Sequence, residues 1–269
     1  MNKNLSICIT VKNRSRVESE NGTLLLFPNC IDSIVRSIPP DISTEIVITD
    51  WESDDWPIKK WITERVTDLP VHLITLEGKG FSRGKGLNIA ADQAEGKVLF
   101  FMDADMIVSP DVIRAAYDNA NNDQVYIPQC KYYINGGRDF TWDWGVGNMC
   151  MSSERFYKAG KWPEYSRWGF EDHDFLDKLK IDGKIIYKRD GEFVHQWHPQ
   201  SEEWKNRYAD KSAKAILEID NRRVAHKKIV ETEEELIIRS LGAYAKRNGQ
   251  QQKPKNDRTG SGIPRIGEF

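Results

Sequence analysis

A chain of 269 residues is long enough to bury one large hydrophobic core. Hydrophobic residues make up 39% of it and charged residues 30%, a balance that excludes an integral membrane protein and a chain that is disordered as a whole. The 39 Lys and Arg residues are matched by 41 Asp and Glu residues, so no overall positive field exists to bind nucleic acid or an anionic membrane.

Strands and helices are predicted to alternate along the first part of the chain. Four apolar runs are predicted strands: Leu5–Val11, Glu45–Thr49, Val71–Leu76 and Val98–Met102. Three stretches with helical features lie between them: Asn29–Ile38, Pro57–Thr67 and Gly84–Ala94. This alternation predicts an α/β fold with a mostly parallel sheet. Because such sheets bind ligands at the carboxyl ends of their strands, we expect the polar residues that follow the strands to form the functional site.

The pattern is less regular in the second part of the chain. A helix is expected to begin near Asp172, and Ser201–His226 is a long helix candidate. Capping-box spacing at residues 232–235 precedes a further apolar segment. Lys246–Phe269 has six basic and two acidic residues and no hydrophobic periodicity, so we expect a flexible, solvated tail that could also contact anionic lipid headgroups.

The chain shows no sign of secretion or membrane insertion. Its first apolar run is interrupted too soon for a signal peptide, and no stretch of about 18 apolar residues occurs. None of the four cysteines forms a CxxC pair: Cys8, Cys30, Cys130 and Cys150. We therefore expect reduced, partly buried thiols in a cytoplasmic protein, not a zinc site or a disulfide framework.

A pair of carboxylates follows the most apolar predicted strand. Asp103 and Asp105 are two residues apart and leave the strand on the same side. Because neighbouring aspartates repel each other, a divalent cation or a metal-bound diphosphate beside them would fit this arrangement, although the pair alone is a weak signal for a metal. The alternative is an ordinary strand-end loop with an Asx turn.

Two histidines, His195 and His198, are spaced three residues apart. They could share one metal ion, or they could lie on the surface or in the core without a ligand. Imidazole is a better ligand for transition metals than for Mg²⁺, so a site shared with the two aspartates would favour Mn²⁺.

The segment Trp168–Asp174 combines an aromatic residue, a glycine and several acids. Acidic residues at the start of the predicted helix are explained by capping and by the helix dipole. The Trp168-Gly169 pair is not explained in this way. An indole beside paired acids suits a sugar, because the ring stacks on the pyranose while the acids accept its hydroxyl groups.

Basic and aromatic residues also follow the strands. Lys12 and Arg14 come after the first strand, and Phe81, Arg83 and Lys85 after the third. Guanidinium groups and helix N-termini bind phosphate oxygens, and a phenyl ring can stack on a base. Ordinary surface charge is the alternative for each residue alone.

Taken in chain order, these segments resemble the GT-A glycosyltransferases of family 2 with a β-1,4-galactosyltransferase-type C-terminal block, a group that includes bacterial polysaccharide enzymes. Ile9–Arg14 is similar to that group's Ile-Pro-Phe-Arg-Asn-Arg, and Phe81–Asn88 to its Phe-Asn-Arg-Ala-Lys-Leu-Leu-Asn. Asp103-Ala104-Asp105 matches its Asp-Val-Asp, and Trp168–Asp174 resembles its Trp-Gly-Gly-Glu-Asp-Asp-Asp. The similarity spans about residues 5–200.

The resemblance implies a role for each matching residue. The donor nucleotide and its sugar would be bound by Thr10, Lys12, Arg14, Asp50, Phe81, Arg83, Asp103, Asp105 and Gly147. A divalent metal, Mn²⁺ or Mg²⁺, would be held by Asp105, His198 and His195. Trp168 and Glu171 would contact the acceptor, and Asp172 would be the catalytic base. The segment from about Lys161 to Phe170 would become ordered over the bound donor.

The implied fold is GT-A: a Rossmann-like, mostly parallel sheet flanked by helices, with C-terminal helices. One domain would span residues 1–245 and precede the basic tail at 246–269. Its parts would be a nucleotide-binding half at about 1–108, an acceptor and metal half at about 109–200, and C-terminal helices at about 201–245.

The implied activity is an inverting, metal-dependent transfer of galactose or N-acetylgalactosamine from a UDP-sugar to a hydroxyl group of a glycan or lipid-linked saccharide. A sugar-nucleotide hydrolase or a nucleotidyltransferase is one alternative, and the Trp168–Glu171 platform argues against it. A non-catalytic protein that binds glycans or nucleotide sugars is the other, and the joint presence of Asp105, Asp172 and His198 argues against that. We expect a cytoplasmic enzyme with no nucleic-acid partner, whose basic tail could contact the inner face of the membrane.

Overall fold

The computed structural model describes residues 3–199 apart from 79, 135–137, 144, 166–169 and 183. All of these residues belong to the compact unit Met1–Lys205. The helices expected over 201–245, the tail expected over 246–269 and Trp168 lie outside the described residues. Within the described part of the chain, no helix is long and apolar enough to cross a membrane.

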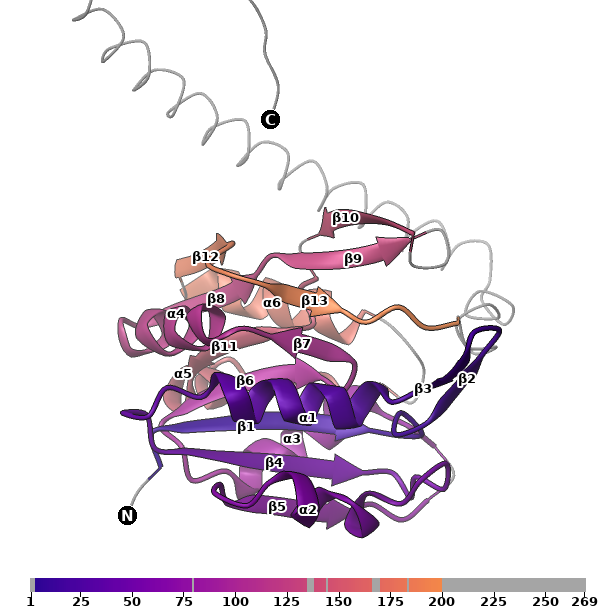
Figure 1. The fold of residues 1–269 in the computed structure, drawn as a ribbon. Coiled ribbons are helices and arrows are strands. Elements are labelled where there is room, and N and C mark those ends of the chain that lie inside the picture. The colour runs from indigo at the N-terminus through magenta and orange to yellow at the C-terminus, as the bar shows by residue number, and fades with distance from the viewer. Residues whose placement is uncertain are drawn as a thin grey trace, which may run out of the picture. The chain divides into compact units, whose positions relative to one another are not determined.

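A seven-stranded sheet forms the centre of this unit (Figure 1). Its strands are β1 (Leu5–Val11), β4 (Thr44–Asp50), β5 (Val71–Thr75), β6 (Val98–Asp103), β8 (Gln124–Pro128), β11 (Met149–Ser152) and β12 (Lys184–Lys188). Their order across the sheet is β12-β8-β11-β6-β1-β4-β5. Neighbouring strands are parallel except at β11, which runs antiparallel to β6 and β8. The predicted mostly parallel α/β sheet is therefore confirmed.

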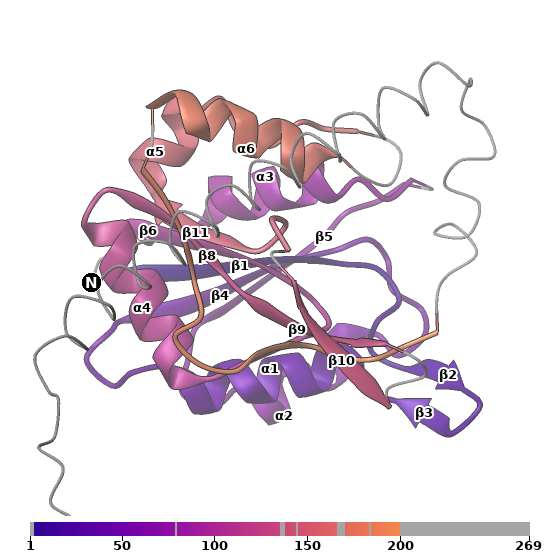
Figure 2. The same cartoon turned by 90° about the horizontal axis from the view of Figure 1, so that it is seen from above.

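Helices cover both faces of the sheet (Figure 2). One face carries α1 (Leu26–Ser37), α2 (Ile62–Arg65) and α4 (Pro110–Asn121), and the other carries α3 (Arg83–Gln93), α5 (Ser153–Lys158) and α6 (Glu171–Asp182). Successive residues of a strand point to opposite faces, so Ile7 joins the core under α1 whereas Cys8 joins the core under α3. All four cysteines are buried and have free thiols.

Two predicted helices differ from the structure. α1 begins at Leu26 instead of Asn29, because Pro28 is tolerated in the first turn, where its missing N–H group has no intrahelical partner. The single helix predicted over 57–67 is wrong: a 3₁₀ turn, η1 (Ile58–Lys60), is followed by the short α2. Trp61 between them is buried, and its ring packs edge-on against Phe27 at 5.5 Å. Packing of this indole takes precedence over a continuous helix.

A second sheet of four strands was not predicted. Its order is β10-β9-β13-β7, formed by β7 (Met106–Val108), β9 (Cys130–Ile134), β10 (Asp139–Asp143) and β13 (Phe193–His195). His195 in β13 lies opposite Met106 in β7, and the Gln196 N–H donates a hydrogen bond of 3.0 Å to the Asp105 carbonyl. This pairing brings the residues after β13 beside the end of β6. A small hairpin of β2 (Val17–Ser19) and β3 (Gly22–Leu24) is separate from both sheets.

Candidate active site

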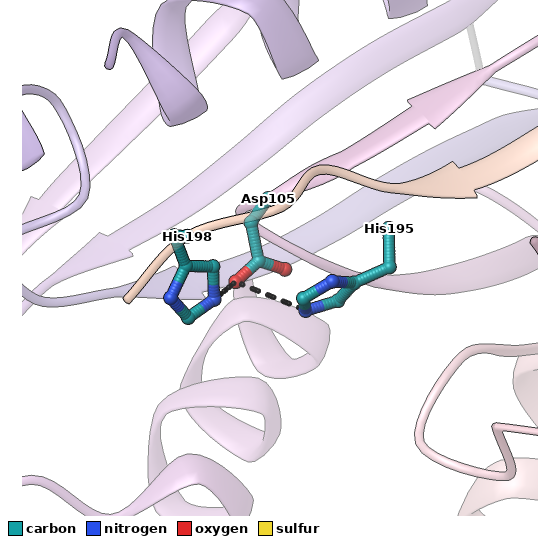
Figure 3. A group of neighbouring side chains, drawn as sticks. All are labelled: Asp105, His195 and His198. Carbon is teal, nitrogen blue, oxygen red and sulfur yellow. Dashed lines mark ion pairs between the residues drawn. The ribbon is translucent and has the colours of Figure 1, made fainter. Parts of the chain in front are cut away.

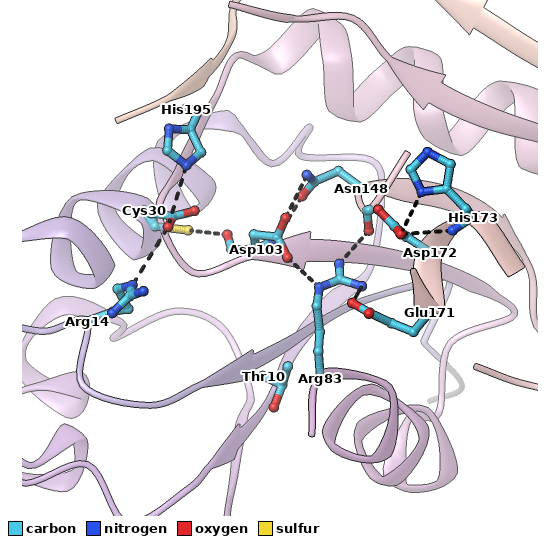
Figure 4. Close-up of polar contacts among 12 residues, drawn as sticks. Thr10, Arg14, Cys30, Arg83, Asp103, Asn148, Glu171, Asp172, His173 and His195 are labelled. Carbon is cyan, nitrogen blue, oxygen red and sulfur yellow. Dashed lines mark hydrogen bonds and ion pairs between the residues drawn. The ribbon is translucent and has the colours of Figure 1, made fainter. Parts of the chain in front are cut away.

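Several predicted site residues lie together at the carboxyl ends of β1 and β6 (Figure 4), and β4 ends beside them in the sheet. Thr10 lies near the end of β1, Asp50 ends β4, and Asp103 ends β6. These three strands are parallel neighbours, so their ends lie along one edge of the sheet. The first residue of α3, Arg83, and the first residue of α6, Glu171, reach the same edge.

The second aspartate of the pair lies between the two histidines (Figure 3). Asp105 Oδ2 is 3.3 Å from His198 Nε2 and 3.7 Å from His195 Nε2. The Arg14 Nε atom lies 3.9 Å from the same oxygen. Burial favours the neutral acid, but the two imidazoles and Arg14 outweigh it and hold the pKa of Asp105 well below its usual range.

The donor atoms of Asp105, His195 and His198 fit a divalent cation. One ligand atom from each residue lies within 4.8 Å of the others, and all three residues are partly buried. His198 Nδ1 is 2.9 Å from the Pro199 carbonyl, a contact that leaves Nε2 as the nitrogen turned towards Asp105. One carboxylate and two imidazoles suit a transition metal such as Mn²⁺ better than Mg²⁺.

The imidazole of His195 differs from that of His198 in its surroundings. Its Nδ1 atom is buried and has no hydrogen-bond partner among the described residues. Its ring packs against Tyr132 of β9, with ring centroids 4.6 Å apart and an interplanar angle of 31°. The orientation of this ring is therefore fixed by packing.

Arg83 links Asp103, at the end of β6, to Glu171, at the start of α6. Its Nε atom donates a hydrogen bond of 2.8 Å to Asp103 Oδ1, and its Nη2 atom donates one of 2.6 Å to the Gly147 carbonyl. Nη1 is 3.7 Å from Glu171 Oε1, and the guanidinium lies over the Trp162 ring. Burial opposes the charge of Arg83, but Asp103 and Glu171 outweigh it and raise the pKa of the guanidinium, so the group stays charged. One cation thus holds together residues predicted for the donor and for the acceptor.

Asn148 is a buried polar residue of the site that the sequence analysis did not single out. Its Nδ2 atom donates a hydrogen bond of 2.9 Å to Asp103 Oδ2, and its Oδ1 atom accepts one of 2.8 Å from the Asp103 N–H. Its only sequence signal was its place directly after Gly147 and directly before an apolar run.

The first turn of α6 presents the predicted base. Asp172 Oδ1 accepts a hydrogen bond of 2.8 Å from the His173 N–H and lies 2.9 Å from His173 Nδ1. Burial disfavours its charge, but His173 and the Arg83 charge outweigh it, so the pKa of Asp172 is lowered. Burial raises the pKa of the neighbouring Glu171, although Arg83 opposes the shift. The two adjacent acids therefore differ: Asp172 is the one that stays ionised as the pH falls.

The other predicted donor residues have contacts of their own. Thr10 Oγ1 accepts a hydrogen bond of 3.0 Å from Trp51 Nε1, and Phe81 packs edge-on to the Trp51 ring at 5.9 Å. Asp50 Oδ1 accepts a hydrogen bond of 3.0 Å from the Ser53 N–H, which fixes the turn after β4. Lys12 lies half-buried directly after β1.

The segment expected to close over the donor is described only in part. Residues 166–169 lie outside the described residues, so its response to ligand stays a prediction. Its beginning is anchored: Trp162 is buried, and Asn88 both donates to its carbonyl and accepts from its N–H, each at 3.0 Å. Phe170 at its other end has φ of +76°, a conformation that glycine adopts more readily.

Comparisons with known proteins agree with this architecture. The family model described as "Glycosyl transferase family 2" matches residues 6–181. None of the curated proteins matches the chain.

Among solved structures, S. aureus TarS has a similar fold. Residues 1–349 of TarS superpose with a TM-score of 0.58 at 17% identity, covering 72% of this chain and 60% of that one. The same fragment in complex with UDP-GlcNAc gives 0.59 at 17% identity, covering 78% and 62%, and its complex with UDP gives 0.57 at 18% identity, covering 73% and 61%. The chain therefore spans less than two thirds of these TarS fragments.

Proposed function

The chain belongs to glycosyl transferase family 2, and from this premise we propose that it transfers a sugar from a UDP-sugar to a hydroxyl group of a glycan or lipid-linked saccharide. The observation that carries the proposal is the meeting of three groups at one sheet edge. These are the Asp105–His195–His198 cluster, the Arg83–Asp103 pair and the acidic first turn of α6. In this proposal they would supply a metal site, a fixed cation and a base within one site.

The donor is proposed to lie across the ends of β1 and β6. Arg14 and Lys12 would meet the diphosphate, since cations bind phosphate oxygens at such strand ends. Thr10, Asp50 and Phe81 would meet the nucleoside, and Asp103 and Gly147 the ribose or sugar. The TarS fragment that binds UDP and UDP-GlcNAc supports the choice of a UDP-sugar.

The identity of the sugar rests on the resemblance of the C-terminal block. That resemblance favours galactose or N-acetylgalactosamine, whereas the TarS complex makes N-acetylglucosamine a third candidate. All three sugars therefore belong in a donor screen.

Asp105, His195 and His198 are proposed to hold Mn²⁺, with Mg²⁺ as the weaker alternative. When bound, the metal would neutralise negative charge on the leaving diphosphate. The chain's own contribution is to place the three ligands through the β13–β7 pairing: His195 lies in β13, Asp105 directly precedes β7, and His198 follows β13 by three residues.

Asp172 is proposed as the base of an inverting reaction. It would take the proton from the acceptor hydroxyl as that oxygen bonds to the anomeric carbon and the bond to the diphosphate oxygen breaks. Its lowered pKa keeps it ionised at neutral pH, which is the state a base needs. Glu171 and Trp168 would contact the acceptor sugar.

Several wider properties are proposals of the same kind. They are the single catalytic domain over 1–245, the cytoplasmic location and the membrane contact of the tail at 246–269. They rest on the sequence, because residues 200–269 lie outside the described part of the chain.

The proposal is tested by donor binding and by product analysis. With Mn²⁺ present, we expect UDP-galactose, UDP-N-acetylgalactosamine or UDP-N-acetylglucosamine to raise Tm. Release of UDP should then accelerate when an oligosaccharide or lipid-linked saccharide is added. Release that yields free sugar at the same rate with and without every acceptor would indicate a hydrolase. Binding of UDP-sugars without any release would indicate a binding protein.

A further inference from the structure

We propose that Asn148 is a positioning residue that fixes the Asp103 carboxylate for donor binding; this inference rests on the proposed function. Nothing in the sequence assigned a role to Asn148. The structure places it against the carboxylate and the backbone of one aspartate, at the point where the donor is proposed to lie.

The contact follows from the sheet. Asn148 directly precedes β11, and β11 runs antiparallel to β6 with Met149 opposite Phe101. Asn148 therefore lies beside the end of β6, where Asp103 is. Its amide accepts from the Asp103 N–H at 2.8 Å and donates to Asp103 Oδ2 at 2.9 Å, so one side chain satisfies two groups of the same residue (Figure 4).

Arg83 takes the other carboxylate oxygen. Its Nε atom donates to Asp103 Oδ1 at 2.8 Å, so both oxygens have a protein partner. With one oxygen hydrogen-bonded to Asn148 and the other to Arg83, the carboxylate cannot rotate without breaking a hydrogen bond. An ionised carboxylate has about four lone-pair positions, which leaves positions free for hydroxyl groups of a ligand.

The two aspartates, Asp103 and Asp105, differ in the exposure of their side chains. The Asp103 side chain is 36% exposed, whereas that of Asp105 is 13% exposed and faces the histidines. Asn148 itself is 5% exposed, so its hydrogen bonds to Asp103 are shielded from water. The accessible carboxylate is thus held in place for a ligand, while the less accessible one belongs to the metal cluster.

Only a primary amide fits this position. Asn148→Ala removes both hydrogen bonds and leaves the Asp103 N–H without its partner. Asn148→Asp keeps an acceptor for that N–H but places a second carboxylate against Asp103 Oδ2. If Asn148 served only the backbone N–H, the aspartate variant would be the better of the two. If it positions the carboxylate, the aspartate variant is the worse, because like charges repel.

The test measures UDP affinity with Mn²⁺ by calorimetry and, for an accepted donor, KM and kcat separately. We expect Asn148→Ala to weaken UDP binding and raise KM by about 10–100-fold, the loss expected for a hydrogen bond to a charged group. Asn148→Asp should bind UDP more weakly still. Affinity for Mn²⁺ alone should change less than about 2-fold, because Asn148 does not touch Asp105. Asn122→Asp, which changes an exposed amide directly after α4, is the matched control and should bind UDP as wild type does.

Two further measurements separate positioning from general stability. In an Asp103→Ala background, Asn148→Ala should add no further loss of UDP affinity; multiplicative losses would overturn the inference. A crystal structure of Asn148→Ala should show the Asp103 carboxylate turned from its wild-type orientation, and an unmoved carboxylate would also overturn it. This last readout needs no ligand. Wild-type protein that binds no UDP would instead count against the proposed function, so the two failures are distinguishable.

Discussion

The Asp105 carboxylate lies 3.3 Å from His198 Nε2, and this contact joins the end of β6 to the segment after β13. The positions of both residues depend on contacts between segments that are distant in sequence. The β13–β7 pairing and the hydrogen bond from Gln196 N–H to the Asp105 carbonyl bring the two segments together. The Asp105–His195–His198 cluster is therefore assembled by the second sheet and should stay assembled without a ligand.

Removal of the cluster's carboxylate should abolish metal-dependent binding. We expect Asp105→Ala to lower Mn²⁺ affinity by at least about 100-fold and to remove the Mn²⁺-dependent part of UDP binding, because the remaining imidazoles lack the negative ligand. His198→Ala should have a smaller effect in the same direction. Calorimetry with Mn²⁺ alone and then with Mn²⁺ and UDP measures both.

Asp118→Asn removes an exposed carboxylate of α4 and serves as the control for charge. It should bind Mn²⁺ and UDP as wild type does. An Asp105→Ala protein with unchanged affinity for Mn²⁺ and UDP would show that the cluster is not the metal site. EDTA should reproduce the loss of UDP affinity in wild type.

Much of the central sheet was predictable from local pattern. β1 coincides with its predicted range. β5 and β6 differ from their predicted ranges by one residue at one end, and β4 and α3 differ by one residue at each end. Each of these elements has a continuous apolar run or helical spacing, so the local sequence pattern is enough to predict it. The prediction failed at Trp61, where the side chain packs against Phe27, a residue distant in sequence. Local spacing carries no information about such a contact.

The site was predictable in part. Asp105, His195 and His198 were singled out, and the structure brings them together. The pairing of β13 with β7 that assembles them could not be predicted, because each strand has only three residues. Asn148 was missed because a single asparagine before a strand has no periodicity, and its importance depends on its contact with Asp103.

Arg83 should tolerate no replacement, not even by lysine. The guanidinium contacts Asp103, Gly147 and Glu171 in three directions, and one ammonium group cannot reach all three. We expect Arg83→Lys to lower UDP affinity by about 10–100-fold and to lower Tm, because the buried Glu171 loses its cation. Arg114→Lys, which alters an ion pair on α4, should leave UDP affinity unchanged. Wild-type UDP affinity in Arg83→Lys would show that the three contacts of the guanidinium are not needed for UDP binding.

Gly86 should contribute to the stability of the fold. A Cβ atom at this position would lie 2.0 Å from Thr10 Oγ1, because α3 approaches β1 closely there. Gly86→Ala should reduce the free energy of unfolding by about 1–3 kcal/mol through overpacking. Thermal unfolding measures the loss. Gly80→Ala is the matched control, since its Cβ would meet no described atom within 4 Å. Equal Tm values for the two variants would contradict this interpretation of the α3–β1 contact.

Gly147 should affect the donor site more than the fold. A Cβ atom would lie 3.2 Å from Arg83 Nη2 and 3.5 Å from Asp103 Oδ2, so the guanidinium would have to shift by a few tenths of an ångström. We expect Gly147→Ala to weaken UDP binding by about 3–10-fold, roughly 1 kcal/mol, with little change in Tm. Gly145→Ala, whose Cβ would meet nothing within 4 Å, should behave as wild type. If both variants lose affinity equally, backbone stiffness and not the Arg83 contact is responsible.

Asp172 is the residue whose role separates a catalyst from a helix cap. It lies in the first turn of α6 and accepts a hydrogen bond from the His173 N–H, which is a structural function. Asparagine caps a helix about as well as aspartate, so Asp172→Asn should keep its Tm and its UDP affinity. If Asp172 takes the acceptor proton, transfer should fall by about 10²–10⁴-fold. Asp177→Asn, on an exposed part of the same helix, should transfer at the wild-type rate. The transferred sugar should also change from α-linked in the donor to β-linked in the product. Asp172→Asn protein that transfers within a few-fold of wild type, or an α-linked product, would overturn the assignment of Asp172 as the base.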